Sequence, residues 1–303
     1  MRILLSGYYG QGNFGDDLLL KTIVKNLPDH SIGNLSYDVL AWQKVPKLER
    51  LRLFIAQSKV VMAQHDWLVF GGGTTFHENM PLQYFICRLA KKQGLRIAAI
   101  GVGTRASGIN KFLLRRIVAM SACFLVRDHY SLMQCGSKAK LTADLVFANK
   151  FEFKRDVHPA RTIGISLVKG ARDYGKIWGD FHSPDDLRVV YLNCQHEEGR
   201  KLSANAPTEG FEDLDVILGM RLHTLILAAM MGIPFVGINH DPKIAELCKT
   251  FEMPCLPVSA DNWAIVQAVN AAKLSPNHAD ILSDQVSLAR WNFRILRQFL
   301  GYD

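Results

Sequence analysis

Short apolar runs alternate with helical patterns along most of this chain of 303 residues, and this alternation limits its fold more than any other feature. Strand-like runs at residues 2–6, 37–42, 67–70, 96–102 and 123–126 are separated by helical patterns at 17–27, 47–64, 82–93 and 111–120. Buried strands separated by helices are typical of a parallel sheet with helices on both faces. The sequence therefore predicts an α/β fold.

A charged, irregular stretch at residues 149–159 predicts a linker, because strand-like runs resume after it at 162–167, 189–194, 215–218 and 235–238. A chain of this length fits two domains. We expect Rossmann-like domains at residues 1–150 and 151–285, facing each other across a cleft. A helix at 286–303, whose pattern is clearest at 286–300, would pack back on the first domain.

The net charge of +8 favours an anionic partner, such as nucleic acid, an anionic membrane face or a phosphorylated small molecule. Basic residues are spread in short pairs without an aromatic-rich module, so nucleic acid is the weaker interpretation. No apolar run is long enough for a membrane span, and the N-terminal one is too short for a signal peptide. Six scattered cysteines without a C-x-x-C pair indicate a reducing cytoplasm, with neither a zinc site nor a disulfide framework.

Cationic residues follow two neighbouring predicted strands. Arg221 and His223 lie after the strand at 215–218, where an apolar helix begins, and His240, Asp241 and Lys243 follow the strand at 235–238. Ligands bind at the carboxyl ends of parallel strands, and helix N-termini there favour anions. The pattern predicts a site for a small, strongly anionic molecule. A structural alternative stays open, because Asp241 and the proline after it also suit a plain helix start.

A glycine loop at residues 7–17 contains a G-x-G-x-x-G pattern after the first strand, which invites a dinucleotide interpretation. Asp16 and its neighbour Asp17 stand where a pyrophosphate would lie, so that interpretation is the weaker one. We expect Gly10, Gly12, Asn13 and Asp16 to line the cleft, with Asp16 or Asp17 capping the following helix.

Two further segments end strands in the first half. Gly71, Gly72 and Gly73 can cradle an anion with their amides, with His77 at the same sheet edge; the alternative is a packing loop and an exposed histidine. Arg127 can serve as an anion clamp, or it can form a surface ion pair with the aspartate that follows it.

Taken together, these segments resemble the polysaccharide pyruvyltransferase family. The matching pieces are residues 7–16, 71–73, 126–131 with Asp144 beyond, 219–223 and 234–243, in the same order over most of the chain. The resemblance implies a GT-B-like fold, with the acceptor side in the first domain and the donor side in the second. The second domain would be shortened, because the stretch between Cys194 and Asp215 is short for the family.

The resemblance also implies an activity: transfer of a pyruvyl group from phosphoenolpyruvate onto a sugar of a surface polysaccharide or its precursor, forming a ketal. No cofactor and no metal would be needed. His223 would be the general acid, because imidazole titrates near neutral pH, and Arg221 and Arg127 would stabilise the departing phosphate. The expected donor contacts are Arg127, Arg221, His223, His77, Lys243 and His240.

The implied partners are phosphoenolpyruvate and a saccharide acceptor that could be lipid-linked, in the cytoplasm or at the inner face of the membrane with peripheral association. One departure is that Val168, Lys169 and a glycine follow the strand at 163–167, where the family has an arginine; Lys169 or Arg172 could substitute. The alternatives are a GT-B glycosyltransferase using a nucleotide sugar and a non-catalytic relative, with an NAD-dependent oxidoreductase last.

Overall fold

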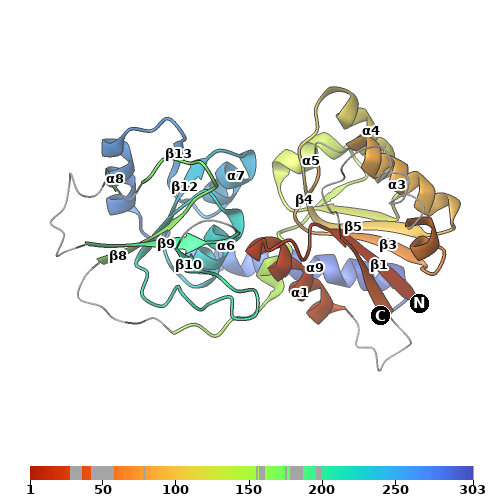
Figure 1. Ribbon diagram of the computed structural model, residues 1–303, viewed down its shortest axis with the longest axis horizontal. Helices are drawn as coiled ribbons and strands as arrows, with labels where there is room; N and C mark the ends of the chain where they lie inside the picture. Colours follow the sequence, from red (N-terminus) through yellow and green to blue (C-terminus); the bar gives the residue numbers. More distant parts are fainter. Residues whose placement is uncertain are drawn as a thin grey trace. The chain divides into compact units, whose positions relative to one another are not determined.

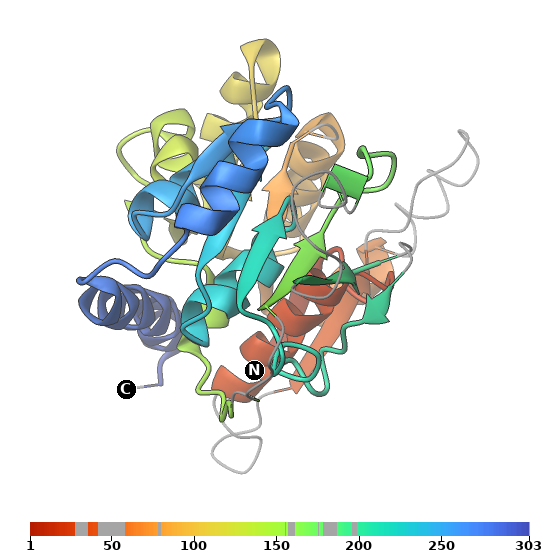
Figure 2. The same ribbon diagram turned by 90° about the vertical axis from the view of Figure 1, so that its left-hand side faces the viewer.

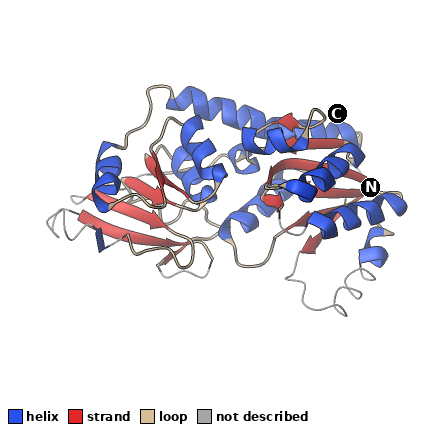
Figure 3. Cartoon of the chain, turned by 90° about the horizontal axis from the view of Figure 1, so that it is seen from above, coloured by secondary structure: helices blue, strands red, loops and turns tan. Residues whose placement is uncertain are grey.

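The structure is a computed structural model that describes residues 1–27, 36–41, 58–77, 80–154, 156, 161–174, 176–177, 187–195 and 199–302. Two compact units divide the chain: the first comprises Met1–Gln11, Leu19–Ala148 and Gln285–Asp303, and the second comprises Gly12–Leu18 and Asn149–Asp284. Each unit is a parallel sheet flanked by helices (Figures 1 and 3). Two helices, α1 (Phe14–Asn26) and α9 (His278–Leu300), contribute residues to both units.

The first unit contains a seven-stranded parallel sheet. Its strands are β1 (Arg2–Gly7), β2 (Ser36–Ala41), β3 (Trp67–Gly71), β4 (Thr74–Phe76), β5 (Arg96–Thr104), β6 (Cys123–Val126) and β7 (Lys140–Leu141). The order is β2-β1-β3-β5-β6-β7, with β4 paired to β5, so the strand order reverses between β1 and β3. Strands covered on both faces are apolar almost throughout, as the sequence of β3 is.

Helices α3 (Met80–Lys92), α4 (Gly108–Met120) and α5 (His129–Cys135) cover one face of this sheet, and α1 and α9 cover the other (Figure 1). Phe70 of β3 packs in one apolar core with residues of α3 and α4. Its neighbour Gly71 points to the opposite face, against Ile23 of α1. On that face Asn292 of α9 accepts a hydrogen bond from the main chain of Gly101 at 2.9 Å.

The second unit contains a six-stranded parallel sheet (Figure 2). Its strands are β8 (Arg161–Ser166), β9 (Leu187–Asn193), β10 (Arg200–Lys201), β11 (Val216–Gly219), β12 (Phe235–Asn239) and β13 (Cys255–Pro257). The order β10-β9-β8-β11-β12-β13 is that of a Rossmann sheet, with the topological switch point between β8 and β11. Helices α6 (Leu222–Met230), α7 (Pro242–Thr250) and α8 (Asn262–Ala271) follow β11, β12 and β13.

The shortening of the second unit lies between β9 and β10. Only residues 194–199 separate these two parallel strands, which is too few for the helix of a usual crossover. The chain turns back at Gly199, whose φ of 116° is open to glycine and where a Cβ would strike the carbonyl group of Tyr191. The resemblance implied a shortened second domain; the described residues lack a helix between β9 and β10, but the strand remains as β10.

The predicted alternation and the two Rossmann-like domains of a GT-B-like fold are confirmed, but several element bounds were wrong. Helix α1 begins at Phe14 instead of Asp17, and α9 begins at His278 instead of residue 286. The short strand β7 was not predicted, and a 3₁₀ turn, Leu145–Ala148, follows it. The helical pattern at 47–64 lies mostly outside the described residues. Within its described part, residues 58–62 are helical. None of the described helices combines the length and apolar character needed to span a bilayer.

Candidate functional site

Arg221 lies at the switch point of the second sheet. Gly219 of β11 pairs with Ser166 of β8, and the N–H group of Met220 donates to the Ser166 carbonyl at 2.7 Å. Arg221 is the N-cap residue of α6, and its Nε donates to the carbonyl oxygen of Leu167 at 3.0 Å. The half-buried guanidinium group is thereby held at the carboxyl ends of both strands, beside a helix N-terminus that favours anions.

His240, Asp241 and Lys243 follow the adjacent strand β12 at the start of α7. The Asp241 side chain caps α7 by accepting from the Lys243 N–H group at 3.2 Å, and it lies 3.4 Å from the Lys243 ammonium nitrogen. Burial lowers the pKa of His240; the charges of Lys243 and Arg221 lower it further, while the Ile238 carbonyl and Asp241 oppose them. Arg221 and Lys243 are therefore close enough to His240 to act on its charge, and we call these three residues on neighbouring strand ends the cationic cluster, in which Arg221 and Lys243 carry the positive charge.

His223 lies in the first turn of α6 and faces the first turn of α1. Asn13 caps α1, since its Oδ1 accepts the N–H group of Gly15 at 3.0 Å. The N–H group of Phe14 donates to the carbonyl oxygen of Cys194, just after β9, at 2.8 Å. Gly15 has no side chain where the His223 imidazole packs, and any Cβ there would collide with the ring. The two motifs at 7–17 and 219–223 thus meet within the second unit.

The helix cap predicted at Asp16 or Asp17 is Asn13. Because α1 begins at Phe14, both acidic residues lie in its first turn, where the helix dipole stabilises negative charge. Gly10 and Gly12 both adopt a φ of 70°, so the loop needs glycine for its backbone conformation alone. Their predicted role in lining a cleft, like that of Asn13 and Asp16, stays a prediction.

A buried polar network next to His223 escaped the sequence analysis. Thr224 Oγ1 lies 3.0 Å from Ser166 Oγ and 3.1 Å from Cys194 Sγ, so α6 is joined to the ends of β8 and β9. All three residues are buried. Two positions in the sequence could have revealed this network: Ser166 at the end of an apolar strand and Thr224 within an apolar helix. Polar groups buried in such elements are almost always hydrogen-bonded, so each needs a partner.

The ion pair between Arg127 and Asp128 is present, but Arg127 is buried in the first unit, so the pair does not lie on the surface. Arg127 Nη1 lies 3.0 Å from Asp144 Oδ2, its Nε 3.5 Å from Asp128 Oδ2, and its Nη2 donates to Thr74 Oγ1 at 3.1 Å. Two carboxylates already neutralise this guanidinium group, so an incoming anion would have to compete with them. A donor contact by Arg127 therefore stays a prediction, beside an evident structural role.

The triple-glycine loop is packed against α1. The Tyr9 hydroxyl donates to the Gly71 carbonyl, and a Cβ at Gly71 would strike Tyr9 and Ile23. Gly72, with a φ of 65°, is equally close to Leu19. Tyr9 is only 2% exposed and fills the switch point between β1 and β3. The close approach that the glycines permit is therefore that of side chains of the first unit itself.

The predicted site residues divide between the two units. The second unit holds Gly12, Asn13, Asp16, Arg221, His223, His240 and Lys243, whereas the first holds Gly10, Gly71, Gly72, Gly73, His77 and Arg127. His77 is half-buried and directly follows β4. Its contact with a donor stays a prediction.

The two residues considered as substitutes for the family's arginine differ in setting. Lys169 is exposed just after β8. Arg172 donates to the Ala260 carbonyl at 2.9 Å and lies 4.8 Å above the Tyr174 ring, so it is committed to packing. Among the described residues, no group of His, Cys, Asp or Glu side chains is placed to hold a metal ion.

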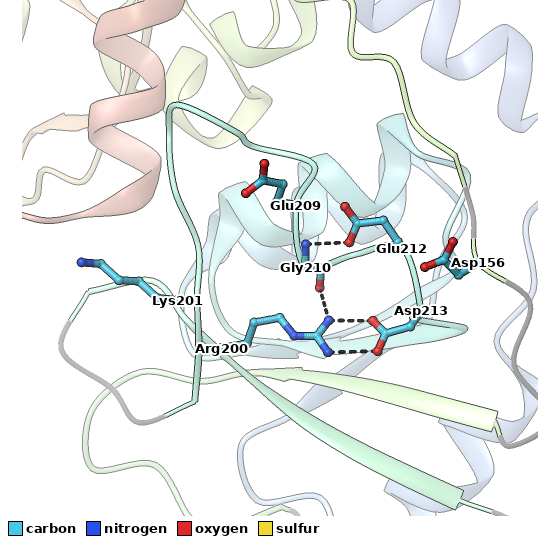
Figure 4. Close-up of a pocket in the computed structure, with 7 residues that line it drawn as sticks. All are labelled: Asp156, Arg200, Lys201, Glu209, Gly210, Glu212 and Asp213. Carbon is cyan, nitrogen blue, oxygen red and sulfur yellow. Dashed lines mark hydrogen bonds and ion pairs between the residues drawn. The ribbon is translucent and has the colours of Figure 1, made fainter.

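A pocket of about 460 Å³ elsewhere in the second unit includes none of the predicted site residues (Figure 4). Its lining residues are Asp156, Arg200, Lys201, Glu209, Gly210, Glu212 and Asp213. Arg200 forms a two-pronged ion pair with Asp213, with nitrogen–oxygen distances of 2.6 and 2.9 Å, which holds the pKa of Asp213 below its usual value. This pair ties β10 to the turn before β11.

Comparison with known proteins agrees with this architecture. A putative UDP-N-acetylglucosamine 2-epimerase from Listeria monocytogenes is similar at a TM-score of 0.63 and 11% identity, over 100% of this chain and 97% of that one. The UDP-GlcNAc 2-epimerase of Neisseria meningitidis, bound to UDP-GlcNAc, gives 0.62 and 10%, over 99% and 100%. An Anabaena protein in complex with UDP and glucose gives 0.55 and 10%, over 99% of each chain. These low identities show a shared fold alone.

No curated protein matches the chain at a significant level. The family profile described as "Polysaccharide pyruvyl transferase" matches residues 13–242. That range begins at the residue that caps α1 and extends to the first residue of α7, so it includes Arg221 and His223 and, of the second strand-end motif, His240 and Asp241. Lys243 lies one residue beyond it. The chain therefore belongs to the polysaccharide pyruvyl transferase family.

Proposed function

We propose that this protein transfers a pyruvyl group from phosphoenolpyruvate onto two hydroxyl groups of a sugar, forming a cyclic ketal and releasing phosphate. The observation that carries the proposal is the cationic cluster of Arg221, His240 and Lys243 at the switch point of the second unit. Phosphoenolpyruvate has a carboxylate and a phosphate on adjacent atoms, so it needs several cationic groups within a few ångströms. Membership of the family supports the same reaction class.

Arg221 is the proposed main contact with the donor. Its Nε is bonded to Leu167, which orients the guanidinium plane, and the N-terminus of α6 adds its partial positive charge. Lys243 and His240 approach from the neighbouring strand end, where the start of α7 adds a second helix N-terminus. Stabilising the phosphate as it leaves would lower the barrier by several kcal/mol in a site that excludes water.

His223 is the proposed general acid. A proton delivered to the methylene carbon of the donor creates an oxocarbenium-like centre, which one sugar hydroxyl attacks. Phosphate then leaves, and the second hydroxyl closes the ketal, so that no oxidant and no further reactant is needed. Support comes from the fixed position of the ring between the first turns of α1 and α6. Arg127 and His77 are proposed as further contacts from the first unit.

Donor binding provides the first test. We expect phosphoenolpyruvate to raise the midpoint of thermal unfolding, and Arg221→Gln to weaken its binding by about tenfold to a hundredfold, as for loss of a charged hydrogen bond. Arg188→Gln is the matched control, since Arg188 lies on β9 and pairs with Asp213 instead. Protection by UDP-sugars instead of phosphoenolpyruvate would indicate a nucleotide-sugar glycosyltransferase. Protection by neither would indicate a non-catalytic relative.

Turnover provides the second test. Phosphate released from phosphoenolpyruvate should depend on a saccharide acceptor, so a panel of glycans can identify the acceptor by this readout. His223→Ala should lower turnover by about 10²-fold or more. Near-normal turnover in that variant would remove His223 from the mechanism.

A further inference from the structure

Residues 80–127 of the first unit carry a larger net positive charge than the whole chain. They contain nine Lys and Arg and no Asp or Glu, whereas the net charge of the protein is +8. This feature is not visible as a dense basic run, because successive cations are spaced one to eleven residues apart. The missing acidic residues are the signal.

This stretch includes α3 and α4, which lie side by side, with α5 next to α4, on one face of the sheet (Figure 1). Each of the three helices follows a strand of the same parallel sheet and leads back toward its other end, so their N-termini share one end. Residues at equal distances from the three N-termini are therefore expected at a similar level across the face.

Large apolar side chains are exposed within the first six residues of each of these helices. Phe85 of α3 is 43% exposed, Ile109 and Phe112 of α4 are 69% and 57% exposed, and Met133 of α5 is 69% exposed. Isolated exposed apolar residues are common, but four on three adjacent helices form a patch of the kind that marks an interaction site.

The cations of the same helices occupy the next turns. Exposed in the second halves of α3 and α4 are Arg88, Lys91, Lys92, Arg115 and Arg116. On α3, Arg88 and Lys92 continue the exposed stripe of Phe85, and on α4, Arg116 continues that of Ile109 and Phe112, by the helical spacing of three or four residues. An apolar row thus lies beside a basic row on what we call the α3–α4–α5 face.

The chemistry of this face selects among partners. A second copy docked symmetrically on the same face could not neutralise the basic row, because α3, α4 and α5 contain no Asp or Glu. Nucleic acids use basic grooves with aromatic rings for stacking, whereas this face is a set of parallel helices that also exposes the aliphatic chains of Ile109 and Met133. Apolar side chains beside Lys and Arg match the boundary between acyl chains and anionic headgroups of a lipid bilayer.

We propose that the α3–α4–α5 face docks on the surface of an anionic lipid bilayer, with Phe85, Ile109, Phe112 and Met133 at the acyl boundary and the basic row against the headgroups. The face belongs to the first unit and the cationic cluster to the second, so the proposal does not depend on pyruvyl transfer. It would bring the protein to the surface on which a lipid-linked acceptor of the proposed reaction would lie.

Co-sedimentation of the full-length protein with vesicles tests this proposal. We expect binding to vesicles that contain phosphatidylglycerol, little binding to pure phosphatidylcholine, and release as salt shortens the screening length from about 10 Å to about 3 Å. Arg115→Glu with Arg116→Glu should lower the partition coefficient by about 25-fold or more, since each surface cation contributes about fivefold. The control Lys249→Glu with Lys273→Glu changes net charge equally at exposed sites of the second unit and should bind almost normally.

The apolar row has its own pair of variants. Ile109→Ser with Phe112→Ser should weaken vesicle binding by about tenfold or more, whereas Trp263→Ser, which removes a side chain that is 63% exposed on α8, should not. Equal losses in patch and control variants would overturn the proposal, because net charge alone would then explain binding. Absence of binding to anionic vesicles at low salt would overturn it, as would a dimer in solution that Phe112→Ser dissociates.

Discussion

Gly15→Ala should disable His223 while leaving the fold intact. A methyl carbon at Gly15 would lie 2.6 Å from Cγ and 2.8 Å from Cε1 of the imidazole, and closer still to Nδ1. Non-bonded carbon atoms settle about 3.5–4.0 Å apart, so the ring must move by about 1 Å or rotate away. A misplacement of that size costs about 10²-fold in rate when the displaced group takes part in the chemistry.

The effect on stability should be small, and this separates the variant from a folding defect. Gly15 lies in the first turn of α1, where alanine favours the helix by up to about 1 kcal/mol relative to glycine. That gain opposes the strain of moving a half-buried ring. The midpoint of thermal unfolding should therefore shift by only about 4 °C or less. Affinity for phosphoenolpyruvate should change less than tenfold, because Arg221 and Lys243 are not displaced.

A double-mutant cycle makes this reasoning refutable. In a His223→Ala background the methyl group at Gly15 meets no imidazole, so Gly15→Ala should cause no further loss of turnover. Phosphate release from phosphoenolpyruvate with a competent acceptor is the assay. If the two substitutions multiply their effects instead, Gly15 acts by another route. If Gly15→Ala alone retains normal turnover, the position of the His223 ring does not matter to the reaction.

Three further outcomes follow from the described contacts. Asp144→Ala should lower the free energy of unfolding in urea by about 3 kcal/mol or more, because it leaves the buried Arg127 without its closest carboxylate; a loss under about 1 kcal/mol would contradict this. The folded pKa of His240 lies below 6.5, so the folded state binds fewer protons than the unfolded one, and stability should fall as pH drops below about 6.5. His240→Asn should flatten that dependence in urea titrations between about pH 7 and 5, and an unchanged slope would count against it. Cys255 is the only exposed cysteine, with a pKa lowered by the Cys248 thiol, so one thiol should be alkylated rapidly in the native protein and the other five only on unfolding, as mass spectrometry can verify.

The strands could be predicted where they carry four or more consecutive apolar residues, because burial between two helical layers leaves that pattern in the sequence. Strands of two or three residues, such as β4, β10 and β13, leave no period to read. The start of α1 was missed for a different reason. Asn13 closes the helix by a local hydrogen bond before any helical apolar pattern is established, and two aspartates nearby were more obvious caps.

The cationic cluster was predictable because topology alone brings strand ends together. Arg221 and His240 follow two predicted neighbouring strands, and parallel pairing of β11 with β12 places them at one edge. The sequence could not decide whether Arg127 is an anion clamp or part of an ion pair. Its partner Asp144 lies beyond β7, and only the tertiary fold brings the two side chains together. Sequence spacing located the positive charges, but it could not tell which were already neutralised by carboxylates.

The glycine motif at residues 7–17 takes on a different meaning once Gly15 and His223 are seen together. In a dinucleotide-binding protein such glycines let a pyrophosphate approach the helix, but here Gly15 admits an imidazole from α6. The first turn of α1 is held in the second unit by the bond from Phe14 to Cys194, just after β9, where the sheet lacks its crossover helix. The N-terminus of α1, which comes from the start of the chain, thus packs against His223, the proposed general acid, in the second unit. The motifs at residues 7–17 and 219–223 therefore both fix the position of the His223 ring. A substitution in either motif should alter the packing of the other.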